Sequence, residues 1–159
     1  MNKPYETIEL ENQTIEIYVD EDPINPREWD NLGVMAFFHK RYDLGDNPFN
    51  EPEDLHEFIE DNPCIYLPVY MYDHSGIGLS TDNSRYPFNC PWDSGMLGYI
   101  YVTYEQVKSE WEWKNLTQKR IQKIRDILQS ELETYNYYVS GRCYGYHLRC
   151  KDCKELLGS

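Results

Sequence analysis

The sequence lacks any run of about 20 apolar residues, the length that a membrane-spanning helix needs. Its first residues, MNKPYETIELENQ, also lack the basic segment followed by an apolar segment that marks a secretory signal peptide. These two absences predict a cytoplasmic protein. In that reducing compartment the 5 cysteines are expected to be free thiols.

Internal repeats, low-complexity segments and a linker between two domains are also missing. A chain of 159 residues is of ordinary length for one domain with a core of its own. We therefore expect a single domain over residues 1–159. Its parts would be an acidic N-terminal part (1–62), a central sheet with a long helix (63–149), and a tail that carries a Cys-X-X-Cys motif (150–159).

Basic residues are scarce in the first two fifths of the chain. Residues 1–62 hold 17 Asp and Glu but only 4 Lys and Arg, so this part carries the whole net charge of -13. An acidic face of this size repels nucleic acid and anionic membranes, and it attracts basic protein surfaces. The alternative is that the charge serves only solubility.

Two runs, residues 65–72 and 97–104, alternate large apolar and aromatic side chains on both faces. This pattern is typical of inner strands that are covered on both sides. Shorter runs predict four further strands, at residues 5–10, 14–19, 33–38 and 143–149.

The strongest helix signal covers Thr117–Val139, where apolar residues recur at helical spacing and Gly141 follows at the position of a C-terminal cap. Shorter helices are expected at residues 51–60 and 104–113. This order of elements predicts the α+β class, with a mostly antiparallel sheet, one long helix packed across a face, and short additional helices.

Basic side chains at the start of the long helix oppose its dipole. These are Lys119, Arg120, Lys123 and Arg125. Two interpretations stay open: either packing overrides the mismatch, or this basic patch docks on the acidic N-terminal part.

The linker Asp73–Gly95 holds most of the reactive groups. His74 could act as a general base oriented by Asp93, with Cys90 as a nucleophile or pocket residue. This arrangement would make a small hydrolase or ligand-binding domain. The alternative is structural, because these residues also form turns, and because the contiguous Asp-His-Ser cannot form a triad by itself.

The motif Cys150-Lys-Asp-Cys153 is half of the ligand set of a zinc ribbon. Cys143 and His147 are near enough in sequence to complete four ligands. However, strand alternation would place Cys143 and His147 on one face and Cys150 on the other, and a second Cys-X-X-Cys is absent. We therefore expect no cofactor. The alternative is zinc bound by these four residues, or a site shared across a dimer.

Three motifs carry a resemblance: YDHSG at 72–76, FNCPWDSGMLGYIYV at 88–102, and YGY at 144–146 after a long charged helix. Together they resemble an uncharacterised family of small proteins encoded by phages, prophages and conjugative elements of Gram-positive bacteria. The similarity covers most of the chain from about Glu28, and PWDSG is its most specific part. The resemblance implies a bacterial host cell as the setting and no particular activity. By analogy with small acidic proteins of such elements, it suggests an anti-CRISPR or antirestriction protein.

We therefore hypothesise a phage-encoded inhibitor of a host defence nuclease, of the CRISPR-Cas or restriction type, that acts through an acidic, nucleic-acid-mimicking face. The expected partner is a basic, nucleic-acid-binding host protein, and neither nucleic acid nor a membrane is expected to bind directly. The expected contacts are Glu16, Tyr18, Asp20, Glu21, Asp22, Glu28, Trp29 and Asp30. An enzyme is the less favoured alternative, and the sequence does not indicate an oligomeric state.

Overall fold

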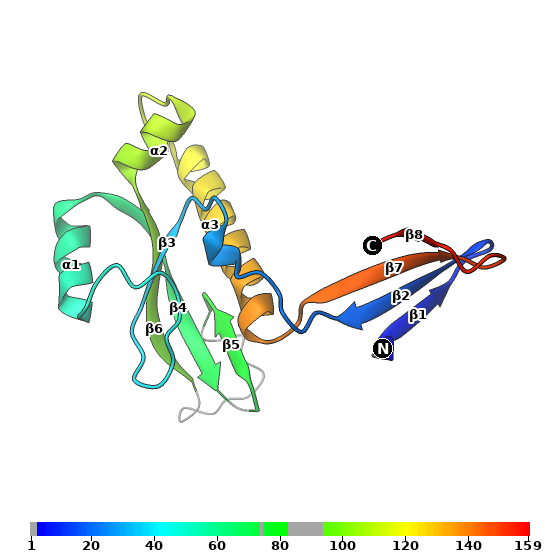
Figure 1. Ribbon diagram of the computed structural model, residues 1–159. Coiled ribbons are helices and arrows are strands. Elements are labelled where there is room, and N and C mark those ends of the chain that lie inside the picture. Colours follow the sequence, from blue (N-terminus) through cyan, green and yellow to red (C-terminus); the bar gives the residue numbers. More distant parts are fainter. Residues whose placement is uncertain (1–2, 74, 83–93) are drawn as a thin grey trace. The chain divides into compact units, whose positions relative to one another are not determined.

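The computed structural model describes residues 3–73, 75–82 and 94–159. The chain forms two compact units, a smaller one from Met1–Ile24 with Gly141–Ser159 and a larger one from Asn25–Ser140 (Figure 1). The expectation of a single domain stays a prediction. Among the described residues, no helix is both long and apolar enough to cross a membrane.

The sheet of the larger unit has the strand order β3-β6-β4-β5, with every neighbouring pair antiparallel. β4 (Cys64–Asp73) and β6 (Ser94–Thr103) are the inner strands, as their two large-residue faces predict. β3 (Val34–Phe37) and β5 (Ile77–Ser80) form the edges. β5 lies within the linker that was predicted for Asp73–Gly95, because its four residues are too few to show an alternation of apolar and polar side chains.

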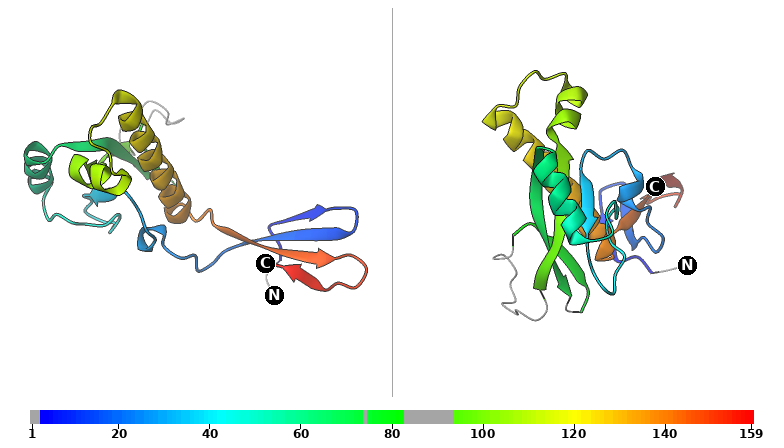
Figure 2. Two further views of the ribbon diagram at one scale, coloured as in Figure 1. Left: turned by 90° about the horizontal axis from the view of Figure 1, so that it is seen from above. Right: turned by 90° about the vertical axis from the view of Figure 1, so that its left-hand side faces the viewer.

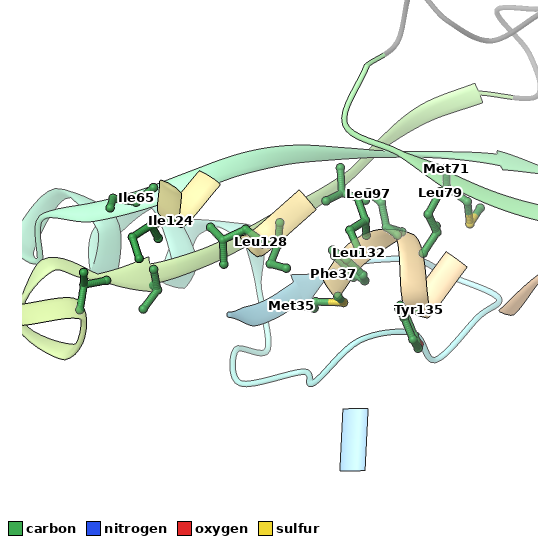
Figure 3. Close-up of a cluster of buried hydrophobic side chains, with 14 residues drawn as sticks. Met35, Phe37, Ile65, Met71, Leu79, Leu97, Ile124, Leu128, Leu132 and Tyr135 are labelled. Atoms are coloured by element: carbon green, nitrogen blue, oxygen red, sulfur yellow. The ribbon is translucent and has the colours of Figure 1, made fainter. Parts of the chain in front are cut away.

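One face of this sheet is covered by α3 (Gln118–Val139). Its buried Ile124, Leu128 and Leu132 belong to one cluster with the strand residues Ile65 and Leu97 (Figure 3). Burying an aliphatic side chain of this size contributes about 1.5 to 3 kcal/mol. The cluster therefore accounts for much of the stability of the larger unit.

The opposite face is covered by α1 (Pro52–Asp61), so the sheet lies between the two helices (Figure 2). Leu55 of α1 is buried with Ala36 and Tyr101 in a second, smaller cluster. A short helix, α2 (Tyr104–Trp111), follows β6 directly, and the Thr103 hydroxyl caps it by accepting from the backbone N–H of Gln106 at 3.2 Å.

The smaller unit is a second antiparallel sheet of order β1-β2-β7-β8. Its strands are β1 (Glu6–Glu9), β2 (Gln13–Val19), β7 (Tyr144–Cys150) and β8 (Leu156–Gly158). The predicted α+β class is confirmed, with antiparallel sheets and one long helix across a face. The strands divide between two sheets, which the sequence pattern did not distinguish.

Gly98 allows β6 to approach β3 closely. It has a φ of +157°, and a Cβ atom there would lie 2.0 Å from the backbone carbonyl oxygen of Ala36. Backbone cannot move aside as a flexible side chain can, so any larger residue must displace the edge strand.

We expect Gly98→Ala to lower the free energy of unfolding by about 2 to 3 kcal/mol, the usual cost of overpacking a dense region. Urea unfolding followed by far-UV circular dichroism measures the change. Gly95→Ala in the same strand is the control, because its added methyl group meets no atom within 4 Å. Equal effects of the two substitutions would contradict the close approach.

Candidate functional site

The eight residues that were predicted to contact a partner divide between the two units. The smaller unit holds Glu16, Tyr18, Asp20, Glu21 and Asp22. The larger unit holds Glu28, Trp29 and Asp30. The eight residues therefore belong to two separate surfaces.

Glu16 and Tyr18 are engaged within the smaller sheet. The Glu16 carboxylate accepts hydrogen bonds from Arg149 Nε at 2.9 Å and from the Tyr18 hydroxyl at 3.0 Å. The Arg149 bond and then the Tyr18 bond hold the pKa of Glu16 below its usual range. The Tyr18 ring also lies 5.0 Å from the ring of His147. These contacts hold both side chains within the smaller sheet, where they join β2 to β7. Their role in binding a partner stays a prediction.

The other predicted residues are more exposed. Asp20 accepts a hydrogen bond from the backbone N–H of Asp22 at 3.1 Å, which shapes the acidic turn that follows β2. In the larger unit, Trp29 is 56% exposed and stands between the exposed carboxylates of Glu28 and Asp30. A large exposed aromatic residue is the kind of side chain that anchors a protein interface.

Arg27 fixes the short 3-10 helix Pro26–Glu28 that precedes Trp29. Its side chain is only 7% exposed, and its Nε donates to Asp46 at 2.9 Å. Its Nη2 donates to the carbonyl oxygen of Gly33 at 2.7 Å, and its Nη1 lies 3.7 Å from Glu131 of α3. The Glu131 carboxylate in turn accepts from the backbone N–H of Gly33 at 2.9 Å. This cluster ties the segment that carries Trp29 to α3.

A groove of about 1150 Å³ lies beside the exposed side of α3. Its lining includes Trp29, Trp113, Arg120, Lys123 and Glu131. The Arg120 guanidinium lies 4.7 Å from the centre of the Trp113 ring, and the Lys123 ammonium lies 5.7 Å from the same centre. The basic start of α3 therefore stacks on aromatic rings. Among the described residues of the larger unit, Arg120 and Lys123 form no ion pair with a carboxylate.

The densest group of exposed carboxylates lies on α1 and its N-cap, which the sequence analysis did not single out as a site. These residues are Glu51, Glu53, Asp54, Glu57, Glu60 and Asp61. Six acids within eleven residues are visible in the sequence as a local excess of negative charge. The predicted contacts lay elsewhere, between Glu16 and Asp30. In the part of the chain that the structure describes, no Lys or Arg forms an ion pair with these six.

The alternative catalytic residues His74, Cys90 and Asp93 all lie outside the described residues. Their neighbour Asp73, at the end of β4, accepts hydrogen bonds from Arg41 at 3.0 Å and from the Tyr42 hydroxyl at 3.1 Å. Asp73 thus ties β4 to the segment after β3, which is a structural use. The catalytic alternative stays a prediction.

The four alternative metal ligands lie in the smaller unit. His147 and Cys150 fall on opposite faces of β7, as strand alternation indicates. Among the described residues, no group of three or more His, Cys, Asp or Glu side chains is placed to hold a metal ion. The pKa of the Cys150 thiol is lowered by hydrogen bonds from the Cys153 backbone N–H, from the Cys153 side chain and from the Asp152 backbone N–H.

Comparisons of the chain with models of protein families, with curated proteins and with solved structures find no match.

We expect Arg27→Met to lower the free energy of unfolding by about 3 kcal/mol, because it leaves the carboxylates of Asp46 and Glu131 without their buried cation. The matched control is Arg41→Met, which breaks the ion pair of a side chain that is 72% exposed, and which should cost under about 1 kcal/mol. Urea unfolding at neutral pH measures both. A loss for Arg41→Met as large as that for Arg27→Met would contradict the assignment.

We expect Arg149→Gln to raise the pKa of Glu16 toward its ordinary value of 4.5, because the largest cause of its lowering is removed. A carboxyl whose pKa is lower in the folded state stabilises that state above its unfolded pKa, and this contribution is lost as pH falls through the folded pKa. The variant should therefore lose stability at neutral pH and show a smaller further loss in acid than the parent. A ¹³C NMR titration of the Glu side chains measures the pKa change.

Glu9 is the internal control in that titration. Its pKa is lowered chiefly by a hydrogen bond from Lys151, which the substitution leaves in place. A Glu9 pKa that moves together with that of Glu16 would show a general loosening of the sheet and would contradict a local ion pair.

Proposed function

We propose that the protein is a phage-encoded interaction protein that inhibits a host defence nuclease by occupying its nucleic-acid-binding surface. The observation that carries the proposal is the row of exposed carboxylates on α1. The partner would be a basic protein of the CRISPR-Cas or restriction type, and the setting would be the cytoplasm of a bacterial host.

The five carboxylates within and at the end of α1 share one side of the helix. At about 100° per residue, Glu53, Glu57 and Glu60 fall within an arc of roughly 60°, and Asp54 and Asp61 extend it to roughly 120°. The buried Leu55 faces the opposite way, into the cluster against the sheet. The helix therefore presents its whole acidic side to solvent while its apolar side holds it in place.

The spacing of these charges is comparable with that of a nucleic acid. Six carboxylates over eleven residues, at about 1.5 Å of rise per residue, give about one negative charge per 2.5 to 3 Å of length. A single strand carries about one charge per 3.4 Å of helix axis, and a duplex about one per 1.7 Å. A groove built to receive phosphates would meet a similar charge density on α1.

The available charge also favours fast capture of such a partner. Because no described Lys or Arg pairs with the α1 carboxylates, their potential extends into solvent. Long-range attraction of this kind raises the association rate and weakens as salt rises, since the Debye length is about 8 Å at physiological ionic strength. The exposed Trp29 between Glu28 and Asp30 is a second contact candidate in the same unit.

The test compares two charge-matched variants in bacterial cells that carry a defined restriction or CRISPR-Cas system. The first variant is Glu57→Gln, Glu60→Gln and Asp61→Asn on α1, and the second is Glu105→Gln, Glu110→Gln and Glu112→Gln on and after α2. We expect the parent chain and the α2 variant to raise phage plating efficiency, and the α1 variant to lose most of that effect. The α1 changes remove negative charge from the C-terminal half of a helix, so they should not unfold it.

Equal activity of the two variants would refute a role for α1. Protection that survives the α1 changes but disappears with His74→Ala would instead favour the small hydrolase or ligand-binding alternative. With purified nuclease, inhibition of DNA cleavage by the parent chain should weaken as salt rises, and a salt-independent inhibition would contradict electrostatic mimicry.

A further inference from the structure

The smaller unit has strands but no buried core. Among the described residues, every fully buried hydrophobic side chain belongs to the larger unit. In the smaller sheet Val19, Tyr144 and Tyr146 are 47%, 47% and 53% exposed. Units of about 40 residues usually need a disulfide, a metal ion or a second subunit to be stable. This sheet therefore has need of an additional cross-link.

The turn between β7 and β8 holds two cysteines, Cys150 and Cys153. Cys150 ends β7, and its backbone N–H donates to the carbonyl oxygen of Glu155 at 2.9 Å. The backbone N–H of Lys154 donates back to the carbonyl oxygen of Cys150 at 3.0 Å, and Lys154 has a φ of +62°. The chain thus folds tightly around residues 151–153.

This geometry is that of a metal-binding turn. Cysteines separated by two residues are the usual pair of ligands on one side of a structural zinc site, where each sulfur binds at about 2.3 Å. Cys153 is exposed and Cys150 is half-buried, so an ion can reach both.

We propose that Cys150 and Cys153 form half of a zinc site, and that the same turn of a second copy of this chain supplies the other two thiolates. A tetrahedral zinc ion takes four ligands, and among the described residues no group of three or more His, Cys, Asp or Glu side chains is placed to hold one, although the Glu155 carboxylate lies 4.0 Å from the Cys153 sulfur. Two identical turns related by a twofold axis supply four sulfurs, and closed twofold pairing is the commonest form of homo-oligomer.

The turn carries charges of both signs. Four thiolates around one Zn²⁺ leave a net charge of about −2, and each copy adds Lys151 and Lys154 but also Asp152 and Glu155 beside its pair. Lys151 is held by Glu9 at 3.0 Å, and its backbone N–H donates to Asn12 in the β1–β2 turn at 3.1 Å. The two turns therefore lie together at one end of the sheet (Figure 1). A metal ion there would bind the β7–β8 turn, which Lys151 links to the β1–β2 turn.

The experiment loads the reduced full chain with zinc or cobalt and measures its metal content and mass. We expect one metal ion per two chains, a dimer in analytical ultracentrifugation that dissociates when a chelator is added, and the intense sulfur-to-metal absorption of tetrahedral cobalt thiolate. Because these readouts use the unaltered chain, they do not depend on a variant that folds. Absence of bound metal, or one ion per monomeric chain, would overturn the proposal.

Cys150→Ser and Cys153→Ser should each abolish the metal-dependent dimer. The matched controls are Cys64→Ser in the larger unit and Cys143→Ser in the smaller unit, and both should retain it. Loss of metal with Cys143→Ser would contradict a site made of the turn alone. The result is independent of the nuclease inhibition assay, since the α1 variant should bind zinc as the parent does.

Discussion

The packing of one side of α3 against the larger sheet determines where the remaining side chains of that unit can act. Since Ile124, Leu128 and Leu132 face β4 and β6, Lys123 lies on the side of the helix away from the sheet, and Arg120, one turn before Ile124, lies at the flank of this apolar stripe. The same rotation brings Glu131 to the backbone N–H groups that precede β3. The buried Arg27 cluster and the tryptophan-lined groove are therefore consequences of one apolar stripe.

The two units are stabilised by different physical interactions. In the larger unit, apolar side chains from both faces of the sheet are removed from water, and charged groups such as Arg27 are buried only with several hydrogen-bond partners. In the smaller unit, the interactions that the structure shows are cross-strand contacts, including the Glu16 pair with Arg149 and the Tyr5 ring 5.1 Å from Tyr144. Exposed contacts of this kind contribute little individually. A metal ion bound at the Cys-X-X-Cys turn would therefore matter more for the stability of the smaller unit than for that of the larger one.

The sequence predicted those elements whose side chains follow a strict period. β4, β6 and α3 are long, and the alternation in β4 and β6 and the helical spacing of Ile124, Leu128 and Leu132 fit only one type of element each. β5 and β8 are short, hold few distinctive residues, and depend on pairing with a neighbouring strand. Pairing between strands is a tertiary property, so neither the short strands nor the division into two sheets could be predicted from local pattern.

The charge of the chain predicts an acidic surface but not which carboxylates form it. Counting charge located the surplus within residues 1–62, but a count cannot tell which carboxylates are already paired. Glu16 carries a negative charge that Arg149 of a distant strand balances, a contact across 133 positions that no local pattern reveals. The carboxylates of α1 have no such partner among the described residues, and a helical projection of Glu53, Glu57 and Glu60 would have shown that they share one face.

The arrangement of charge on α1 argues against solubility as its whole purpose. Like charges three or four residues apart, such as Glu53 with Glu57 and Glu57 with Glu60, each destabilise a helix by about 0.2 to 0.5 kcal/mol. Glu60 and Asp61 also stand at the helix end where the dipole favours cations. Solubility depends on total charge and is satisfied by carboxylates at any exposed position. The proposed recognition by a phosphate-binding groove would account for a row that concentrates repulsion on one side of one short helix, because such a groove detects regularly spaced negative charges.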